Sequence, residues 1–365
     1  MSAPAVRLCF AAAHVALRDD YRELGHSLER PGAAAEIGSH LDWDTTMSLR
    51  RRLDALGFGI AEAMDTAQRF FLGWDNAREL IARTAALGLG NGFCAGAGTD
   101  HLGAVAGPGD LVDGVVFQAR FIQQHGGIPV LLPMPWLSQH RAEPDTYVEI
   151  YRDIVARLDG PLFVHWLGPM FLPSLAGYFP GDSFRRVMAL DRGKLRGCKL
   201  SLLDDALELA VRRELLPHDQ LVLTGDDFHF GRLILGGDPT AAPPAEPPAI
   251  ERWTRVGRHE VALGDFSHAL LGVLDGIAVP AARALQLLAA GDAAGFLAIM
   301  APCEALGQHV FCAPTQHYKA GLAWLAHRNG WQPNAMLVNR EELARDAAHY
   351  ARCEELARRC GALPE

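Results

Sequence analysis

The chain has 365 residues, 49% of them hydrophobic, so it can bury a large core as one barrel or as two ordinary domains. Its formal net charge of −9 at pH 7 comes without basic blocks, which argues against nucleic acid and anionic membrane surfaces as partners. The seven cysteines are widely spaced and include no C-x-x-C pair, a pattern that fits reduced thiols better than a disulfide framework or a zinc knuckle.

Short apolar runs alternate with helical patterns along most of the chain. We expect strands, in chain order, at 7–11, 57–63, 92–96, 127–133, 161–166, the run around Lys199, 220–225 and 259–264. The helical patterns between them cover 43–56, 74–87, 111–124, 147–158, 184–189, 207–216 and 230–235. Eight strands separated by helices favour an α/β fold, a parallel (β/α)8 TIM barrel, over an open doubly wound sheet.

A proline-rich insertion at 238–258 precedes the eighth run, and we expect it to lie on the surface. Beyond that run, helical patterns cover 281–288, 292–310, 315–329 and 340–360. The expected organisation is therefore a barrel over 1–280 and a C-terminal helical extension over 281–365. This extension could pack on the barrel or form a subunit interface, so we expect a homo-oligomer, a dimer or a tetramer. No apolar stretch approaches the roughly 20 residues of a membrane span, and we expect a soluble cytoplasmic protein.

The sixth apolar run carries a lysine, Lys199, and passes through a loop with Asp204 and Asp205 into a helix that these aspartates can cap. A lysine in a buried strand must face a cavity or a partner, because removing an ammonium from water is costly and lowers its pKa. Such a lysine suits Schiff-base chemistry. It could equally be a salt-bridged lysine at the end of a strand.

In such a barrel the active site lies at the carboxyl ends of the strands, where several polar residues are expected. They are Glu62, Asp65, Gly96, Gly98, Asp100, His101, His165, Asp226, Asp227, His229, Asp265 and His268. Each also fits a structural role: the carboxylates can cap helices or turns, His165 can be a core histidine, and the glycines can allow a tight turn. Their convergence on one end of a barrel, around a lysine on a strand, favours a functional site.

Four stretches resemble the dihydrodipicolinate synthase/N-acetylneuraminate lyase superfamily of class I aldolases in order and spacing. They are 95–99 (Ala-Gly-Ala-Gly-Thr), 162–168 (Leu-Phe-Val-His-Trp-Leu-Gly), 197–199 (Gly-Cys-Lys) and 223–227 (Leu-Thr-Gly-Asp-Asp). The segments 285–311 and 318–322 resemble that superfamily's C-terminal helices. More narrowly, 41–44 and 61–68 resemble a branch labelled only as dihydrodipicolinate synthase family proteins of unknown function.

The resemblance implies a TIM barrel, frequently a homotetramer, in which the lysine of strand six forms an imine with a substrate ketone. Carried over to this sequence, Lys199 is that nucleophile, and no cofactor is required. The imine acts as an electron sink, so the implied reactions are retro-aldol cleavage, aldol addition or dehydration.

Two departures from the superfamily bear on the substrate. The Gly-Thr-Thr-Gly-Glu loop that usually holds a substrate carboxylate is replaced at 63–67, where Asp65 would repel one. The superfamily's strand-five tyrosine aligns with Val164, which leaves the neighbouring His165 as the acid or base, although adjacent strand residues face opposite sides. We therefore expect a small hydroxylated ketone, such as a keto-sugar, or a keto acid. The residues expected to bind it are Glu62, Asp65, Gly96, Gly98, Asp100, Asp227 and Asp265.

Three functions remain open at this stage. The first is a lyase in which Lys199 attacks the ketone and His165 or Asp226 moves protons, without a metal. The second is a metal-dependent sugar isomerase, epimerase or lyase, although no compact ligand motif of the H-E-x-x-H kind is present. Its metal ligands would be Glu62, His165, Asp226 and His268. The third is a non-catalytic sugar-binding barrel, against which the retention of Lys199 argues.

Overall fold

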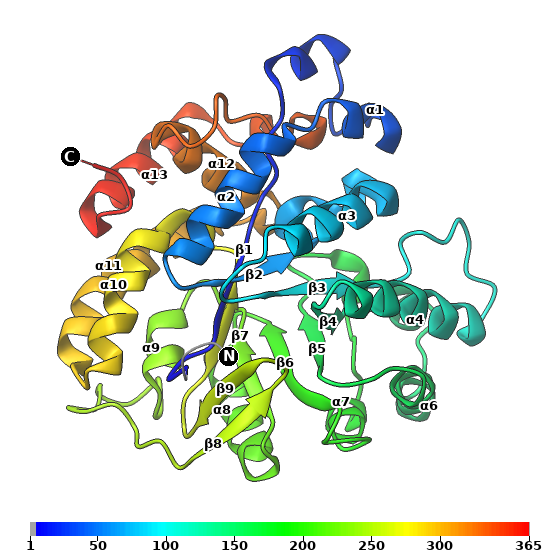
Figure 1. Ribbon diagram of the computed structural model, residues 1–365, viewed down its shortest axis with the longest axis vertical. Helices are drawn as coiled ribbons and strands as arrows, with labels where there is room; N and C mark the ends of the chain where they lie inside the picture. Colours follow the sequence, from blue (N-terminus) through cyan, green and yellow to red (C-terminus); the bar gives the residue numbers. More distant parts are fainter. Residues whose placement is uncertain (1–4, 365) are drawn as a thin grey trace.

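The computed structural model describes residues 5–364, and its centre is a closed barrel of eight parallel strands (Figure 1). Each strand pairs with its neighbours in parallel, and the last pairs with the first. The barrel strands are β1 (Cys9–Ala12), β2 (Gly59–Glu62), β3 (Phe93–Ala97), β4 (Ile128–Leu131), β5 (Leu162–Leu167), β6 (Leu195–Ser201), β7 (Leu221–Thr224) and β10 (His268–Leu271). The predicted (β/α)8 barrel is confirmed.

The eighth barrel strand is β10, and the prediction that it lies at 259–264 is wrong. That run forms β9 (His259–Leu263), which pairs with β8 (Arg252–Val256) in an antiparallel hairpin. Buried side chains of the hairpin, such as Val261, join the apolar cluster inside the barrel, and Gly257 at its turn lies against Ile128 and Pro161, near the amino ends of β4 and β5. The hairpin therefore closes the amino-terminal end of the barrel. The short true strand follows after only four residues, so the apolar pattern did not separate the two.

Helices surround the barrel and connect its strands (Figure 1). They are α1 (Ala34–Ser39), α2 (Trp43–Ala55), α3 (Arg69–Ala86), α4 (Pro108–Gln124), α5 (Pro135–Gln139), α6 (Pro144–Ala156), α7 (Ser183–Met188), α8 (Asp205–Leu215), α9 (Phe230–Leu235) and α10 (Leu274–Ala289). Single 3-10 turns are Asp19–Leu24, Asp65–Ala67, Pro173–Leu175, Leu216–His218, Thr315–His317 and Val338–Ala344. Aspartate side chains cap the amino ends of two of these helices: Asp42 accepts the N–H of Thr45 in α2, and Asp204 accepts that of Leu207 in α8, as expected for the loop after Lys199.

The C-terminal part adds α11 (Ala293–Val310), α12 (Lys319–Arg328) and α13 (Ala347–Cys360), which confirms a helical extension (Figure 1). In the extension, α11 packs against α9, α10 and α13, and α12 packs against α10 and α13. Within residues 5–364, no single helix is long and apolar enough to cross a membrane. One strongly bent pair, α11 with 315–328, meets the criteria of length and composition alone.

Alternation along the strands decides which side chains face the barrel interior. Phe163 of β5 belongs to the apolar cluster inside the barrel, while Val164 belongs to the cluster between barrel and helices. His165, two residues after Phe163, therefore points inward. On β6 the outer cluster contains Cys198 and Leu200, so Lys199 between them also points inward.

Candidate functional site

Lys199 lies at the centre of the barrel, where its neighbours leave room for its side chain. It is in register with His165 of β5 and with Leu223 of β7. At the end of β7, a Cβ added to Gly225 would lie 2.9 Å from Cε of Lys199 and 2.2 Å from Oγ of Ser201. The glycine of the Gly-Asp-Asp turn thus creates the space that the lysine occupies.

Electrostatics around Lys199 favour a neutral amine beside an acid. Burial lowers the pKa of Lys199, and the charges of Asp227 and Asp65 oppose this shift without overcoming it. Asp227 is 3% exposed and accepts the N–H of Val273 at 2.9 Å. Burial raises its pKa to about 7, against the influence of Lys199. Burial therefore favours the uncharged form of both groups, and each charge acts on the protonation of the other.

His165 shares this interior with Lys199 and carries no charge. The side chain is 2% exposed, and its Nε2 lies 3.2 Å from Oγ of Ser201. Within residues 5–364, Nδ1 has no hydrogen-bond partner. Burial and then the neighbouring Lys199 hold the pKa of His165 well below its usual range. A neutral imidazole with a free nitrogen can accept or donate a proton to a bound molecule.

Tyr318 is a site residue that the sequence did not reveal. Its hydroxyl lies 2.8 Å from Oγ1 of Thr66, in the loop after β2, and its ring stacks on Phe311 at 4.2 Å. Burial raises the pKa of Tyr318, and Asp65 and Asp227 raise it further. The extension therefore brings a phenol to the carboxylates that act on Lys199. Its only signal in the sequence is the resemblance of 318–322 to the superfamily's C-terminal helices.

A second buried lysine, Lys319, ties the extension to the loop after β2. Its Nζ donates to the carbonyl of Gln316 at 2.6 Å and lies 3.3 Å from Asp65 and 3.6 Å from Glu341. Gln68 donates to Glu341 at 2.6 Å. Asp65 is thus paired with a cation, so its ability to repel an anion is reduced.

A cavity of about 590 Å³ opens beside this group. Its apolar wall includes Phe70, Phe71, Phe171 and Leu172. The polar side chains that line it are Asp65, Gln68, Gln139, Ser174, Gln316, His317, Lys319 and Glu341. Asp65 belongs both to this wall and to the charges that act on Lys199, although Lys199 itself does not line the cavity. A volume of this size suits a small organic molecule.

Glu62 lies outside the group around Lys199. It follows Ala61, an interior residue, and so faces the helices, where its carboxylate receives two bonds from Arg50 at 2.8 and 2.9 Å and one from Thr84 at 2.6 Å. The side chains of Glu62 and Arg50 are completely buried. Glu62 is therefore part of a structural ion pair, and it is not positioned to reach a molecule held by Lys199.

Asp100 and Gly96 contact a different arginine, Arg69 at the start of α3, and Gly98 contacts Gln118 of α4. Arg69 donates to Asp100 at 2.9 Å and to the carbonyl of Gly96 at 2.7 Å. Gln118 accepts the N–H of Gly98 at 2.6 Å and donates to Asp100 and His101. These groups satisfy one another, which shapes the loop after β3 but leaves Asp100 with little capacity for a substrate.

Asp226 is engaged by its own turn. Its Oδ1 accepts the N–H groups of Phe228 and His229, and its Oδ2 lies 3.0 Å from Nδ1 of His229. The carboxylate is 1% exposed. Of the two neighbouring aspartates, Asp227 and not Asp226 is the one whose charge acts on Lys199.

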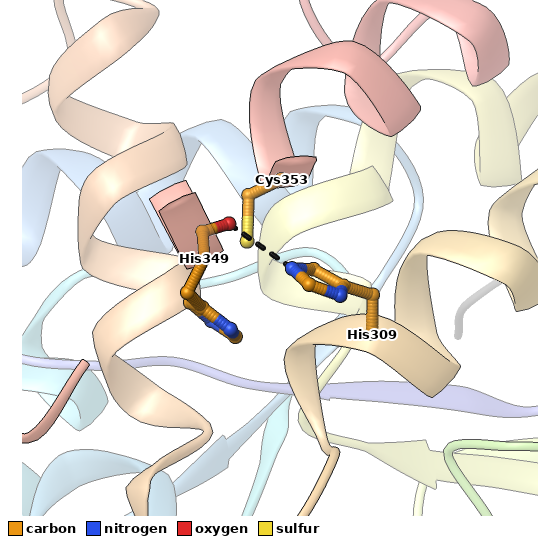
Figure 2. Close-up of side chains that lie close together, drawn as sticks. All are labelled: His309, His349 and Cys353. Carbon is orange, nitrogen blue, oxygen red and sulfur yellow. Dashed lines mark hydrogen bonds between the residues drawn. The ribbon is translucent and has the colours of Figure 1, made fainter. Parts of the chain in front are cut away.

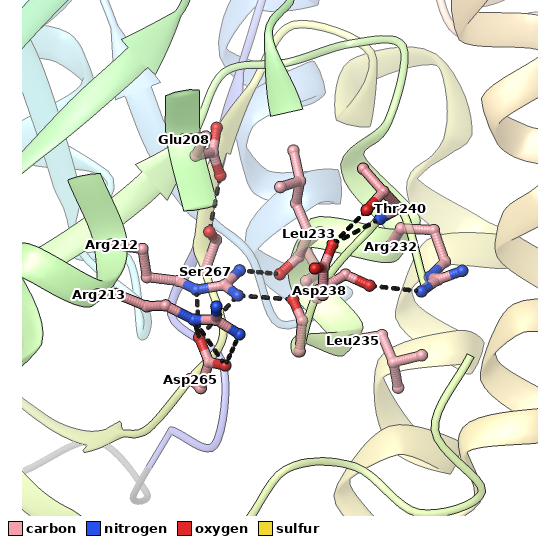
Figure 3. A network of polar contacts seen from close by, with 12 residues as sticks. Glu208, Arg212, Arg213, Arg232, Leu233, Leu235, Asp238, Thr240, Asp265 and Ser267 are labelled. Atoms are coloured by element: carbon pink, nitrogen blue, oxygen red, sulfur yellow. Dashed lines mark hydrogen bonds and ion pairs between the residues drawn. The ribbon is translucent and has the colours of Figure 1, made fainter. Parts of the chain in front are cut away.

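Asp265 and His268 lie at the opposite end of the barrel, which corrects the expectation that they follow the eighth strand. Asp265 precedes β10 and His268 begins it, so both lie at the amino end of that strand. Asp265 pairs with Arg212 and Arg213 at 2.8 and 2.9 Å, in the network of Figure 3. His268 accepts the N–H of Leu8 and bonds the carbonyl of Ala262. The four metal ligands of the second hypothesis are consequently not brought together.

Comparisons with known proteins agree with this barrel. A family described as "Protein of unknown function (DUF993)" matches residues 1–365. Dihydrodipicolinate synthase from Oceanobacillus iheyensis superposes with a TM-score of 0.65 at 13% identity, covering 98% of this chain and 97% of that one. No curated protein sequence matches the chain.

Two further solved structures have the same fold. N-acetylneuraminate lyase from Mycoplasma synoviae gives a TM-score of 0.61 at 11% identity, over 96% of this chain and 97% of that one. A variant of 2-keto-3-deoxygluconate aldolase from Sulfolobus solfataricus gives 0.62 at 10% identity, over 98% of this chain and all of the other. The similarity to the fold of this superfamily that the sequence indicated is confirmed.

Proposed function

Because the chain belongs to the DUF993 family and has the barrel of the dihydrodipicolinate synthase/N-acetylneuraminate lyase superfamily, we propose that it is a lyase of the class I aldolase kind. The single observation that carries this proposal is the position of Lys199, which points into the barrel beside Asp227 and His165 with a lowered pKa. A neutral amine in an enclosed polar site is the requirement for imine formation with a ketone.

In the first step the amine nitrogen of Lys199 adds to the carbonyl carbon of the substrate. The carbonyl oxygen takes up protons and leaves as water, so that amine, ketone and one proton give a protonated imine and water. Asp227, whose pKa of about 7 keeps it partly protonated at neutral pH, is the acid that we assign to this step. Asp227 takes the role foreseen for Asp226, since the turn already occupies the Asp226 carboxylate.

In the second step the protonated imine draws electrons from a neighbouring bond. The hydroxyl on the second carbon from the imine carbon loses its proton. The bond between the first and second carbons then breaks, and an enamine and an aldehyde form. The base must lie near Lys199. His165, with its free Nδ1, meets this description, and the hydroxyl of Tyr318, which burial keeps protonated, can relay the proton through Thr66.

The cavity beside Asp65 supports a hydroxylated ketone as the substrate class, a keto-sugar or a keto acid. Carboxylate and amide groups on its polar side can bind hydroxyls, and the phenylalanine wall can cover the carbon–hydrogen faces of a sugar chain. Lys319, which partly neutralises Asp65, makes a carboxylate on the substrate acceptable.

Trapping the imine tests the proposal. The protein is incubated with a panel of keto-sugars and α-keto acids, reduced with borohydride, and its intact mass is measured. We expect a ligand-sized mass increase with at least one compound, and we expect Lys199→Ala to abolish it. Lys194→Ala is the matched control, because it removes a lysine just before β6 whose Nζ donates to the carbonyl of Val155 outside the site, and it should keep the adduct. An adduct that persists in Lys199→Ala, or no adduct while the protein turns over a ketone, would refute the role of Lys199.

A further inference from the structure

A cluster of two histidines and two cysteines lies in the C-terminal extension, away from the barrel interior. Figure 2 shows three of them, His309 near the end of α11 and His349 with Cys353 on α13. One potential ligand atom from each of the three lies within 4.8 Å of the others. The fourth member, Cys312, follows α11 directly, and its Sγ lies 4.0 Å from Nδ1 of His349.

The spacing in the sequence explains why the four side chains come close together. His349 and Cys353 are four residues apart on one helix, so they lie on the same face. His309 and Cys312 are three residues apart where α11 ends and the chain turns. The packing of α11 against α13 then brings the two pairs together.

His349 is the buried and poorly hydrogen-bonded member of the cluster, whereas His309 is partly buried and its Nε2 lies 3.0 Å from the carbonyl oxygen of His349 (Figure 2). His349 is 8% exposed, and within residues 5–364 its Nε2 has no hydrogen-bond partner. Its Nδ1 lies 4.0 Å from Sγ of Cys312, a weak partner. Cys353 is completely buried. Buried polar atoms normally have partners, so this imidazole lacks a ligand that the protein itself does not supply.

The donor types of the cluster, two imidazoles and two thiols, suit a metal, because imidazole nitrogens and thiolate sulfurs are the usual ligands of zinc. A metal would displace those thiol protons, because coordination deprotonates a thiol.

We propose that His309, Cys312, His349 and Cys353 form a four-coordinate site for a zinc ion. Two thiolates and two imidazoles are a typical donor set for structural Zn²⁺, and they balance its charge. Bonds of about 2.3 Å to sulfur and about 2.0 Å to nitrogen would draw the ligand atoms closer together than they are in this structure. With all four positions filled by protein, the ion has no open position for a substrate, and its role is structural.

A metal in this site would hold one segment of the C-terminal extension in place. The site joins the end of α11 to α13, and the chain between Cys312 and α12 carries Tyr318, directly before Lys319 at the start of α12. Arg345, just before α13, already donates to the carbonyls of Cys312 and Pro314 from the other side of this segment. The metal would therefore fix the segment that delivers Tyr318 to the barrel, and its presence does not depend on which reaction the barrel performs.

Metal binding by the untagged full chain tests the site. Protein purified under reducing conditions is dialysed against a chelator and titrated with Co²⁺, then with Zn²⁺. We expect one Co²⁺ per chain, with the visible absorption of a tetrahedral ion and thiolate-to-cobalt charge transfer, both lost when Zn²⁺ displaces it. Cys312→Ser and Cys353→Ser should weaken the affinity by at least about 10-fold.

Cys360→Ser is the matched control, because Cys360 lies on the same helix but outside the cluster. It should bind Co²⁺ as the original protein does. Cys312 is only partly buried, so Cys312→Ser should fold, which its circular dichroism and metal-free melting temperature would verify. The proposal is overturned if folded protein binds no stoichiometric metal, if either cluster variant binds normally, or if the purified chain has lost two hydrogens through a Cys312 disulfide.

Discussion

Gly225 and Lys199 compete for the same space, since the Cβ that Gly225 lacks would lie 2.9 Å from Cε of the lysine. The backbone of Leu200 closes the other side, with its carbonyl 2.7 Å from the same point. The side chain of Lys199 passes beside Gly225 on its way to the barrel interior, so a larger residue at position 225 would obstruct it. The glycine of the Gly-Asp-Asp turn therefore leaves room for the lysine side chain, in addition to forming the turn.

We expect Gly225→Ala to displace the Lys199 side chain. A methyl group forced into a filled site costs about 1–3 kcal/mol in the free energy of unfolding, and the misplaced amine should form the trapped imine at least about 100-fold more slowly. Denaturant unfolding and the borohydride assay measure the two effects. Gly109→Ala, where a Cβ meets nothing within 4 Å, should leave both unchanged. Normal imine trapping by a folded Gly225→Ala protein would contradict the account.

We expect Tyr318→Phe to separate imine formation from turnover. The substitution removes only the hydroxyl that bonds Thr66, so the imine should still be trapped while kcat falls by about 10²- to 10⁴-fold, the usual effect of losing a proton-transfer group. Tyr178→Phe is the control: that buried hydroxyl bonds the N–H of Met134 and Tyr151 outside the site, and its loss should affect stability alone. If Tyr318→Phe kept full turnover, His165 would remain as the base.

Local pattern was sufficient to predict the barrel and its central lysine. A lysine flanked by Cys198 and Leu200 in an apolar run, followed in the next run by Gly225 and Asp227, is visible in consecutive residues. The orientation of Glu62 was also encoded, because it follows interior Ala61 and strand residues alternate. Glu62 was predicted to bind substrate because it is charged and ends a strand, but the alternation directs its side chain toward the helices.

Long-range contacts were beyond the reach of local patterns. Tyr318 meets Thr66 across 252 positions of sequence, and no periodicity records such a contact. Asp265 was misplaced because two apolar runs only a few residues apart belong to a hairpin and to the barrel. The His309 cluster was missed because it combines an H-x-x-C pair with an H-x-x-x-C pair, 37 positions separate Cys312 from His349, and no C-x-x-C motif marks it.

The pH dependence of turnover should report the pair of Lys199 and Asp227. With Asp227 as the acid of imine formation, kcat/KM should fall as pH rises through about 7, where the carboxyl loses its proton. The two groups interact, so the apparent pKa belongs to the pair. Asp227→Asn should abolish this fall of kcat/KM with rising pH and reduce kcat/KM by about 10²- to 10⁴-fold. Asp226→Asn should keep the fall. If kcat/KM of Asp227→Asn still fell as pH rises through about 7, another group would be the acid of imine formation.

The stability of the protein should depend on pH through Glu208, a buried residue of α8 that accepts a bond from Ser267 at 2.7 Å (Figure 3). Burial raises its pKa from 4.5 to about 8. Between these values the folded protein keeps a proton that the unfolded chain has released, so the stabilisation is full below about pH 4.5 and is lost as pH rises through 8. Glu208→Gln mimics the protonated form and should remove this slope.

At pH 5 the variant and the original protein should therefore unfold alike, and at pH 9 Glu208→Gln should be more stable by roughly 1–4 kcal/mol. Urea unfolding at a series of pH values measures the difference. Glu214→Gln, an exposed position on the same helix, should run parallel to the original protein throughout. If Glu208→Gln lost stability equally at every pH, Glu208 would be ionised in the folded state and its carboxylate would stabilise the barrel as a charge.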